Sequence, residues 1–140
     1  MKTSPAGLAA ITQREGVRLH AYPDSRGIPT IGVGHTGPEV HMGLVWTDAQ
    51  VQATLAQDIA WAENEVNAHV TVPLTQNQFD ALVSFTFNVG KSGFDHSSAL
   101  RDFNYGVTKA ANDLLMWEQP PVLKARRESE RAQFLARSPA

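Results

Sequence analysis

The chain has 140 residues, of which 42% are apolar and 19% are charged, and it contains no cysteine. This length and composition fit one globular domain and exclude a disulfide scaffold and thiol chemistry. The formal net charge of −2 argues against a general nucleic-acid binder, which is normally basic, so no nucleic-acid partner is expected.

The N-terminal stretch MKTSPAGLAAITQ predicts the start of a helix rather than an export signal. Its apolar run is short and is interrupted by Gly7, so it is too short for a signal-peptide core or a membrane span. Ser4 offers a capping hydroxyl and Pro5 suits the first helical position. Leu8 and Ile11 then share a face, and Gly16 can end the helix directly after Glu15.

Residues 16–46 change in character and predict a small β-rich lobe. Glycines and prolines alternate here with short apolar insertions, a composition typical of strands and tight turns. The glycines stand at 27, 32, 34, 37 and 43, and the prolines at 23, 29 and 38.

From Thr47 the apolar residues return to helical spacing. They recur at steps of three and four residues, which predicts one long amphipathic helix over about 47–69 that Pro73 prevents from continuing. The apolar positions are Val51, Leu55, Ile59, Ala62 and Val66.

The remainder of the chain predicts a helical lobe. Thr75 and Gln78 form a capping box before an apolar face that includes Phe79 and Leu82, and Gly90 is a suitable stop. Shorter helices are expected over about 96–104 and 107–117, and a last helix carries Leu123, Phe134 and Leu135. The predicted fold is α+β with segregated elements, in a single domain over 1–140: a β-rich lobe at about 16–46, a connecting helix at about 47–69, and a helical lobe made by about 70–140 with the N-terminal helix.

The stretch REGVRLHAYPDSRGIPTIGVGHT, residues 14–36, holds the residues with the clearest chemistry. Glu15 stands at a helix end, Asp24 in a Pro-Asp-Ser turn and Thr30 at the start of a strand. Glycosidic hydrolysis needs one neutral carboxyl group to protonate the leaving oxygen and one ionised group to activate water. A glutamate against apolar residues and an aspartate in a wet turn can fill these two roles. The same residues alone also fit a simpler interpretation, a solvated helix-terminal acid and a turn-forming aspartate.

The spacing of these residues resembles the catalytic motif of the phage-type lysozymes, glycoside hydrolase family 24. The motif reads E-G-x-x-L-x-A-Y-x-D-S-x-G-x-P-T-I-G-x-G-H-T without gaps. The blocks VPLTQNQFDALVSFTFNVG at 72–90 and RRESERAQFL at 126–135 resemble the helical lobe of the same family. The resemblance implies a two-lobed lysozyme fold with a cleft for strands of alternating N-acetylmuramic acid and N-acetylglucosamine.

The resemblance also implies roles for residues at the matching positions. Glu15 is the expected general acid, Asp24 the second carboxylate, and Thr30 a residue that helps place the attacking water. The family is regarded as inverting, so we expect the two carboxyl groups to lie roughly 6.5–9.5 Å apart. The resemblance thus predicts an endolysin-like muramidase that hydrolyses the β-1,4 bond of peptidoglycan and lyses the bacterial cell.

Outside the catalytic set, the resemblance implies two further groups of residues. His35 is expected to be structural and to pair with Asp58 on the long helix. Asn88 and Arg126 are expected substrate-binding residues, Arg126 lying against the catalytic glutamate, and Ser97 is a further candidate. The five histidines show no metal-ligand spacing among themselves, so neither a metal nor another cofactor is expected.

Two other functions remain open at this point. A lytic transglycosylase needs a single glutamate and forms an anhydro sugar without water, and a non-catalytic peptidoglycan-binding protein needs only the fold. Asp24 with Thr30 favours hydrolysis, because a transglycosylase has no use for a pair that holds water. The expected partner is the glycan strand of bacterial peptidoglycan, and the protein is expected to be a monomer. We expect it to be made in the host cytoplasm, without stable membrane association, and to act on the wall in the periplasm after release.

Overall fold

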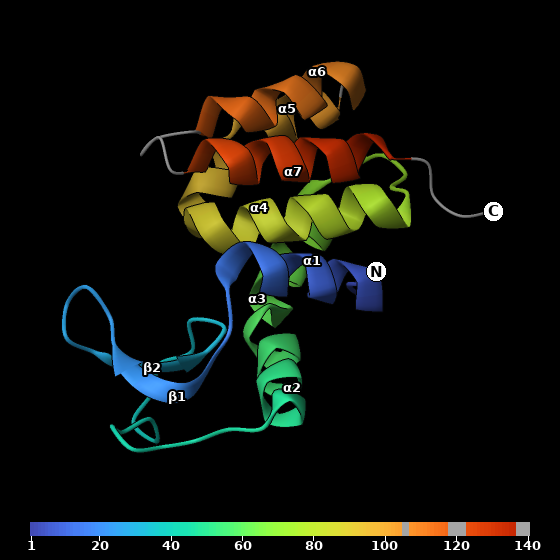
Figure 1. Cartoon of the computed structure of the whole chain (residues 1–140). Coiled ribbons are helices and arrows are strands. Elements are labelled where there is room, and N and C mark those ends of the chain that lie inside the picture. Colours follow the sequence, from blue (N-terminus) through green and yellow to red (C-terminus); the bar gives the residue numbers. More distant parts are fainter. Residues whose placement is uncertain (105–106, 118–122, 137–140) are drawn as a thin grey trace. The chain divides into compact units, whose positions relative to one another are not determined.

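The computed structural model describes residues 1–104, 107–117 and 123–136. It has a two-stranded sheet and otherwise helices, which confirms the predicted α+β class with segregated elements (Figure 1). The elements in chain order are α1 (Pro5–Glu15), β1 (Arg18–Pro23), β2 (Pro29–Gly32), α2 (Asp48–Asp58), α3 (Ala60–His69), α4 (Gln76–Asp95), α5 (Ser98–Phe103), α6 (Val107–Asp113), the 3-10 helix η1 (Leu114–Trp117) and α7 (Lys124–Leu135).

The chain divides into two compact units, and the boundaries fall within α1 and at the start of α3. The hairpin unit is the continuous segment Leu8–Ala60. The helical unit combines Met1–Gly7 with the described residues from Trp61 onward. The helical unit is therefore discontinuous in sequence.

The hairpin unit is built on an antiparallel pair, β1 and β2, in which Tyr22 lies opposite Thr30 and Pro23 opposite Pro29. The pairing is irregular between Arg18 and Tyr22, and isolated bridges extend it to residues 35 and 45. A small apolar core supports the sheet; it consists of Ala21, Ile31 and Val40, with Leu44 and Trp46 packed against it. This core is small because the hairpin is short and only alternate residues of a strand can turn toward the same face.

The helical stretch predicted over 47–69 is present as two helices. Thr47 caps α2 through a capping box with Gln50, and α2 ends at Asp58. Ile59 interrupts the stretch with φ −84° and ψ −5°, and its N–H donates to the carbonyls of Leu55 and Gln57. The side chain of Ile59 stays buried, so the apolar period continues unchanged across the interruption.

The helical unit is centred on α4, whose apolar face begins after a capping box of Thr75 and Gln78, as predicted. Gly90 interrupts α4 with φ +86°, a value that side chains rarely permit, so the predicted stop is a kink between two helical segments. Helix α7 lies lengthwise along α4, and α5 packs against α6 (Figure 1). Phe103 and Phe134 meet edge to face in this core, with ring centroids 5.5 Å apart.

Buried carboxylates fasten the N-terminal residues to the helical unit. The backbone and hydroxyl of Thr3 donate to Glu63 Oε2 at 2.7 and 2.8 Å, and those of Ser4 donate to Asp80. The Ser4 hydroxyl also accepts from the N–H of Gly7, which is the predicted cap of α1. Burial of these acids is tolerated because each accepts several hydrogen bonds.

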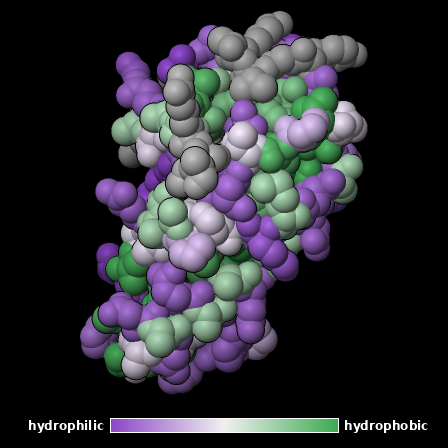
Figure 2. Space-filling view, turned by 90° about the vertical axis from the view of Figure 1, so that its right-hand side faces the viewer, coloured by the Kyte–Doolittle hydropathy of each residue, from purple (hydrophilic) through white to green (hydrophobic). Residues whose placement is uncertain are grey.

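Hydrophobic and hydrophilic residues are interspersed on the face of the molecule shown in Figure 2. Exposed large apolar side chains occur in both units, among them Ile28, Met42 and Val45 in the hairpin unit and Trp61 and Met116 in the helical unit. Among the described helices, each is too short or too polar to cross a membrane.

Candidate active site

Glu15 is the last residue of α1, and the helix ends there because of the residue that follows. Gly16 has φ +79°, the left-handed conformation that terminates helices, and its N–H donates to the carbonyl of Thr12 at 2.9 Å. Glu15 is exposed and interacts with other residues of the protein. A glutamate at this helix end is therefore accessible to a ligand, and its burial in apolar surroundings, which the sequence suggested, is not seen.

Asp24 is held by the turn between β1 and β2. Its Oδ1 accepts hydrogen bonds from the N–H groups of Arg26 at 2.8 Å and Ile28 at 2.9 Å, and its own N–H donates to the Ile28 carbonyl. The Ile28 N–H is the main cause that lowers the pKa of Asp24 below its usual 3.8, and it outweighs the opposing effect of burial. Asp24 is thus an ionised carboxylate at neutral pH, with Oδ2 outside these two bonds.

Thr30 lies on β2, where it is paired with Tyr22 of β1. Its side chain is buried, and its hydroxyl donates to the carbonyl of Ile28 at 2.9 Å. Ile28 therefore links the two predicted residues, because its N–H bonds Asp24 and its carbonyl accepts from Thr30. The Thr30 oxygen retains the capacity to accept a hydrogen bond from water.

His35 lies between two carboxylates of the hairpin unit. Its Nδ1 is 2.7 Å from Oδ2 of Asp58, the pairing expected from the sequence, and its Nε2 is 2.6 Å from Oε1 of Glu39. The imidazole also packs against Trp46, with ring centroids 5.5 Å apart. This arrangement ties the end of the sheet to α2 and leaves both ring nitrogens engaged within the protein.

The charge state of His35 makes the stability of the protein depend on pH. Burial lowers the pKa of His35, but the hydrogen bonds and charges of Glu39 and Asp58 outweigh this effect and raise the pKa above its usual 6.5. The stabilisation is therefore complete below about pH 6.5 and is lost as the pH rises through the raised value. We expect NMR titration to give His35 a pKa above 6.5 and Glu39→Gln to bring it down. A wild-type value at or below 6.5 would contradict this account.

Asn88 and Arg126 belong to the helical unit, where they are connected through Arg127 and Glu130. Arg126 Nε donates to Glu130 Oε2 at 3.2 Å, and its Nη2 donates to the carbonyl of Ser84 at 3.1 Å. Arg127 is fully buried and donates to Asn88, to Glu130 Oε1 at 2.5 Å and to the carbonyl of Trp117 at 2.9 Å. Asn88 is thus oriented by Arg127, and Glu130 lies between the two arginines.

The hydroxyl of Ser97 is engaged at the start of α5. It donates to the carbonyl of Phe94 at 2.8 Å and accepts from the N–H of Leu100 at 3.1 Å, and the residue is buried. This geometry favours a helix-capping role for Ser97 over the expected contact with substrate.

Sequence reasoning missed Glu39, Arg127 and Glu130. Glu39 stands four residues after His35, a spacing that carries no information outside a regular helix. Glu130 stands four residues after Arg126 and three after Arg127 on one helix, a spacing that places its carboxylate beside both arginines. That pattern was the available signal for the buried network.

Most of the chain is similar in sequence and in structure to known proteins. Residues 12–130 match the family described as phage lysozyme. The endolysin of Salmonella phage P22 is 45% identical over 145 residues, covering 97% of this chain and 99% of the endolysin. The crystal structure of a mutant of P22 lysozyme superposes with a TM-score of 0.93 at 43% identity, covering 97% of this chain and 99% of that one. The muramidase domain of SpmX from Asticaccaulis excentricus gives a TM-score of 0.88 at 38% identity, with the same coverage of both chains.

Proposed function

We propose that this chain, which belongs to the phage lysozyme family, is an endolysin-like muramidase that hydrolyses the β-1,4 bond between N-acetylmuramic acid and N-acetylglucosamine in peptidoglycan. The observation that carries the proposal is the pair of carboxyl groups in the hairpin unit. Asp24 is held ionised by backbone N–H groups, and Glu15 is exposed at the end of α1. The similarity to proteins named endolysin and muramidase over nearly the whole chain supports the same activity.

In the proposed mechanism Glu15 is the general acid. It protonates the glycosidic oxygen of the leaving sugar, which requires the neutral carboxyl form. Because Glu15 is exposed, water must be displaced from it at the moment of reaction, and we propose that the bound glycan does this. The bound glycan then keeps bulk water away from Glu15 while the proton is transferred.

Asp24 and Thr30 are proposed to supply the water. Asp24 Oδ2 accepts one hydrogen of the water, and the Thr30 oxygen accepts the other, so the water oxygen points at the anomeric carbon. Attack from the face opposite the leaving group inverts the anomeric configuration. We propose that Asn88 hydrogen-bonds the sugar and that Arg126 is a further substrate-binding residue.

Analysis of the products of purified peptidoglycan tests this function. Digestion in H₂¹⁸O is expected to release fragments with a reducing muramic acid that carries one heavy oxygen at its anomeric carbon. NMR of the first product is expected to show the inverted anomer. Anhydromuramic acid products would instead identify a lytic transglycosylase, and intact glycan would identify a protein that binds without cutting. Either result overturns the proposal.

We further propose that the protein acts as a monomer and reaches the wall from the host cytoplasm. Sedimentation at increasing protein concentration measures the oligomeric state.

A further inference from the structure

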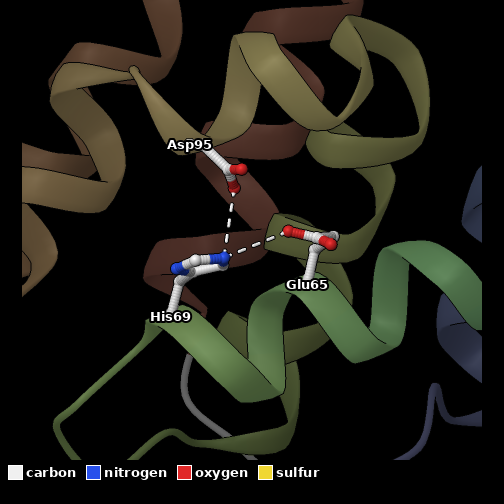
Figure 3. Close-up of side chains that lie close together, drawn as sticks. All are labelled: Glu65, His69 and Asp95. Atoms are coloured by element: carbon white, nitrogen blue, oxygen red, sulfur yellow. Dashed lines mark ion pairs between the residues drawn. The ribbon is translucent and has the colours of Figure 1, made fainter.

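A histidine and two carboxylates converge within the helical unit, apart from the residues proposed for catalysis (Figure 3). Glu65 and His69 are four residues apart on α3 and therefore share one face of the helix. Asp95 ends α4 and reaches the same point. His69 Nε2 lies 3.2 Å from Glu65 Oε2 and 3.4 Å from Asp95 Oδ1, and the three atoms all lie within 4.8 Å of one another.

The two carboxylate oxygens that face His69 are buried and form no hydrogen bond with any described residue. The carboxylates are nevertheless well placed, because Lys91 Nζ contacts their opposite oxygens, Glu65 Oε1 at 3.5 Å and Asp95 Oδ2 at 3.1 Å. Lys91 thus contacts one oxygen of each carboxylate, and the other oxygen of each lies near the imidazole. Buried oxygens without a donor are costly, so this arrangement calls for a cation between them.

A proton on His69 satisfies the cluster poorly. A protonated Nε2 has a single N–H, which would have to be shared between two oxygens on different helices and could be well aligned with only one of them. The distances fit a metal ion better. Zinc binds imidazole nitrogen and carboxylate oxygen at about 2.0–2.1 Å, so neighbouring ligands of a tetrahedral ion lie about 3.3 Å apart. The two measured separations, 3.2 and 3.4 Å, lie on either side of that value.

We propose that Glu65, His69 and Asp95 form a divalent metal site that takes zinc, with water as the fourth ligand. Asn104 fixes the end of α3, because it donates to the His69 carbonyl and accepts from the N–H of Thr71. The ion would join the C-terminal ends of α3 and α4.

Zinc titration of the full chain after chelator treatment tests the site. Calorimetry is expected to give one zinc ion per chain, and the melting temperature is expected to rise with zinc concentration, because the ion binds the folded state. His69→Gln is expected to weaken binding at least about tenfold, as loss of metal-supporting groups does. His41→Gln removes an exposed histidine of the hairpin unit, whose Nδ1 contacts the backbone carbonyl of Met42, and it is expected to bind zinc like wild type.

Two further measurements separate a metal site from a set of ion pairs. Lys91→Met removes the competing cation and is expected to tighten zinc binding, whereas ion pairs alone predict no gain. In the wild-type protein, Co²⁺ is expected to broaden the NMR signals of His69 before those of the other histidines. Absence of saturable zinc binding, equal affinity in His69→Gln, or broadening that begins at another histidine overturns the proposal.

Discussion

Glu15→Gln is expected to abolish the lysis of permeabilised bacterial cells while the fold remains intact. Glutamine keeps the size and polarity of the side chain but has no proton to transfer to the leaving sugar. General acid catalysis contributes typically about 10²–10⁴-fold, so the rate is expected to fall by at least about a hundredfold. Turbidity loss of permeabilised cells measures the rate, and circular dichroism monitors the fold.

Glu128→Gln is the matched control for this variant. Glu128 is exposed on α7 and belongs to none of the proposed catalytic or binding residues. Its replacement makes the same change in charge and is expected to leave lysis near the wild-type rate. Residual activity above about a tenth of wild type in Glu15→Gln would falsify the assignment of Glu15 as the acid.

Arg127→Met is expected to produce the largest loss of stability. Arg127 is fully buried, donates to three different partners and lies over the ring of Phe85 at 5.1 Å from its centroid. Its removal leaves the buried carboxylate of Glu130 with Arg126 but without Arg127. It also takes a hydrogen-bond donor from the side chain of Asn88 and from the carbonyl of Trp117. Breaking a buried ion pair from one side costs about 3–5 kcal/mol. That is a large part of the roughly 5–15 kcal/mol by which domains are stable.

Urea denaturation measures this loss, with Arg131→Met as the control on the same helix. Arg131 is half-buried and donates to Asn112 at 3.0 Å in an exposed contact, so its replacement is expected to cost at most about 1 kcal/mol. Adding Glu130→Met to Arg127→Met is expected to cost less than the sum of the two, because the partners are removed together. Equal losses in Arg127→Met and Arg131→Met would contradict the account.

Much of the fold follows from local signals in the sequence. The capping hydroxyl of Ser4, the box of Thr75 and Gln78 and the interruption at Gly90 each depend on residues within one helical turn. Local chemistry therefore suffices to predict them. The interruption at Ile59 could not be predicted in this way. Its side chain keeps the apolar period, and a change in backbone angles at a residue that stays buried leaves no trace in that pattern.

The charged residues show the other limit of sequence reasoning. Glu63 and Asp80 carry charges, and charged side chains usually lie at the surface. Both are nevertheless buried, because the N-terminal residues donate to them from 60 and 76 positions away. Asp24 is easier to place because its donors lie two and four residues later in the same turn. A carboxylate can be located from sequence when its partners are neighbours, whereas distant partners become apparent only in the folded chain.

The discontinuity of the helical unit has a consequence for the order of events during synthesis. The hairpin unit is one segment, Leu8–Ala60, so the ribosome delivers it complete while the partners of Met1–Gly7 are still untranslated. Glu63 and Asp80 emerge next and can bind Thr3 and Ser4. These contacts join distant residues and so close a loop of the chain whose sequence includes the hairpin unit. Helix α7 comes last. It carries Arg126, Arg127 and Glu130 together and packs them against α4. Glu15, the proposed acid, is therefore synthesised early, whereas Arg126, a proposed substrate-binding residue, is synthesised near the end of translation.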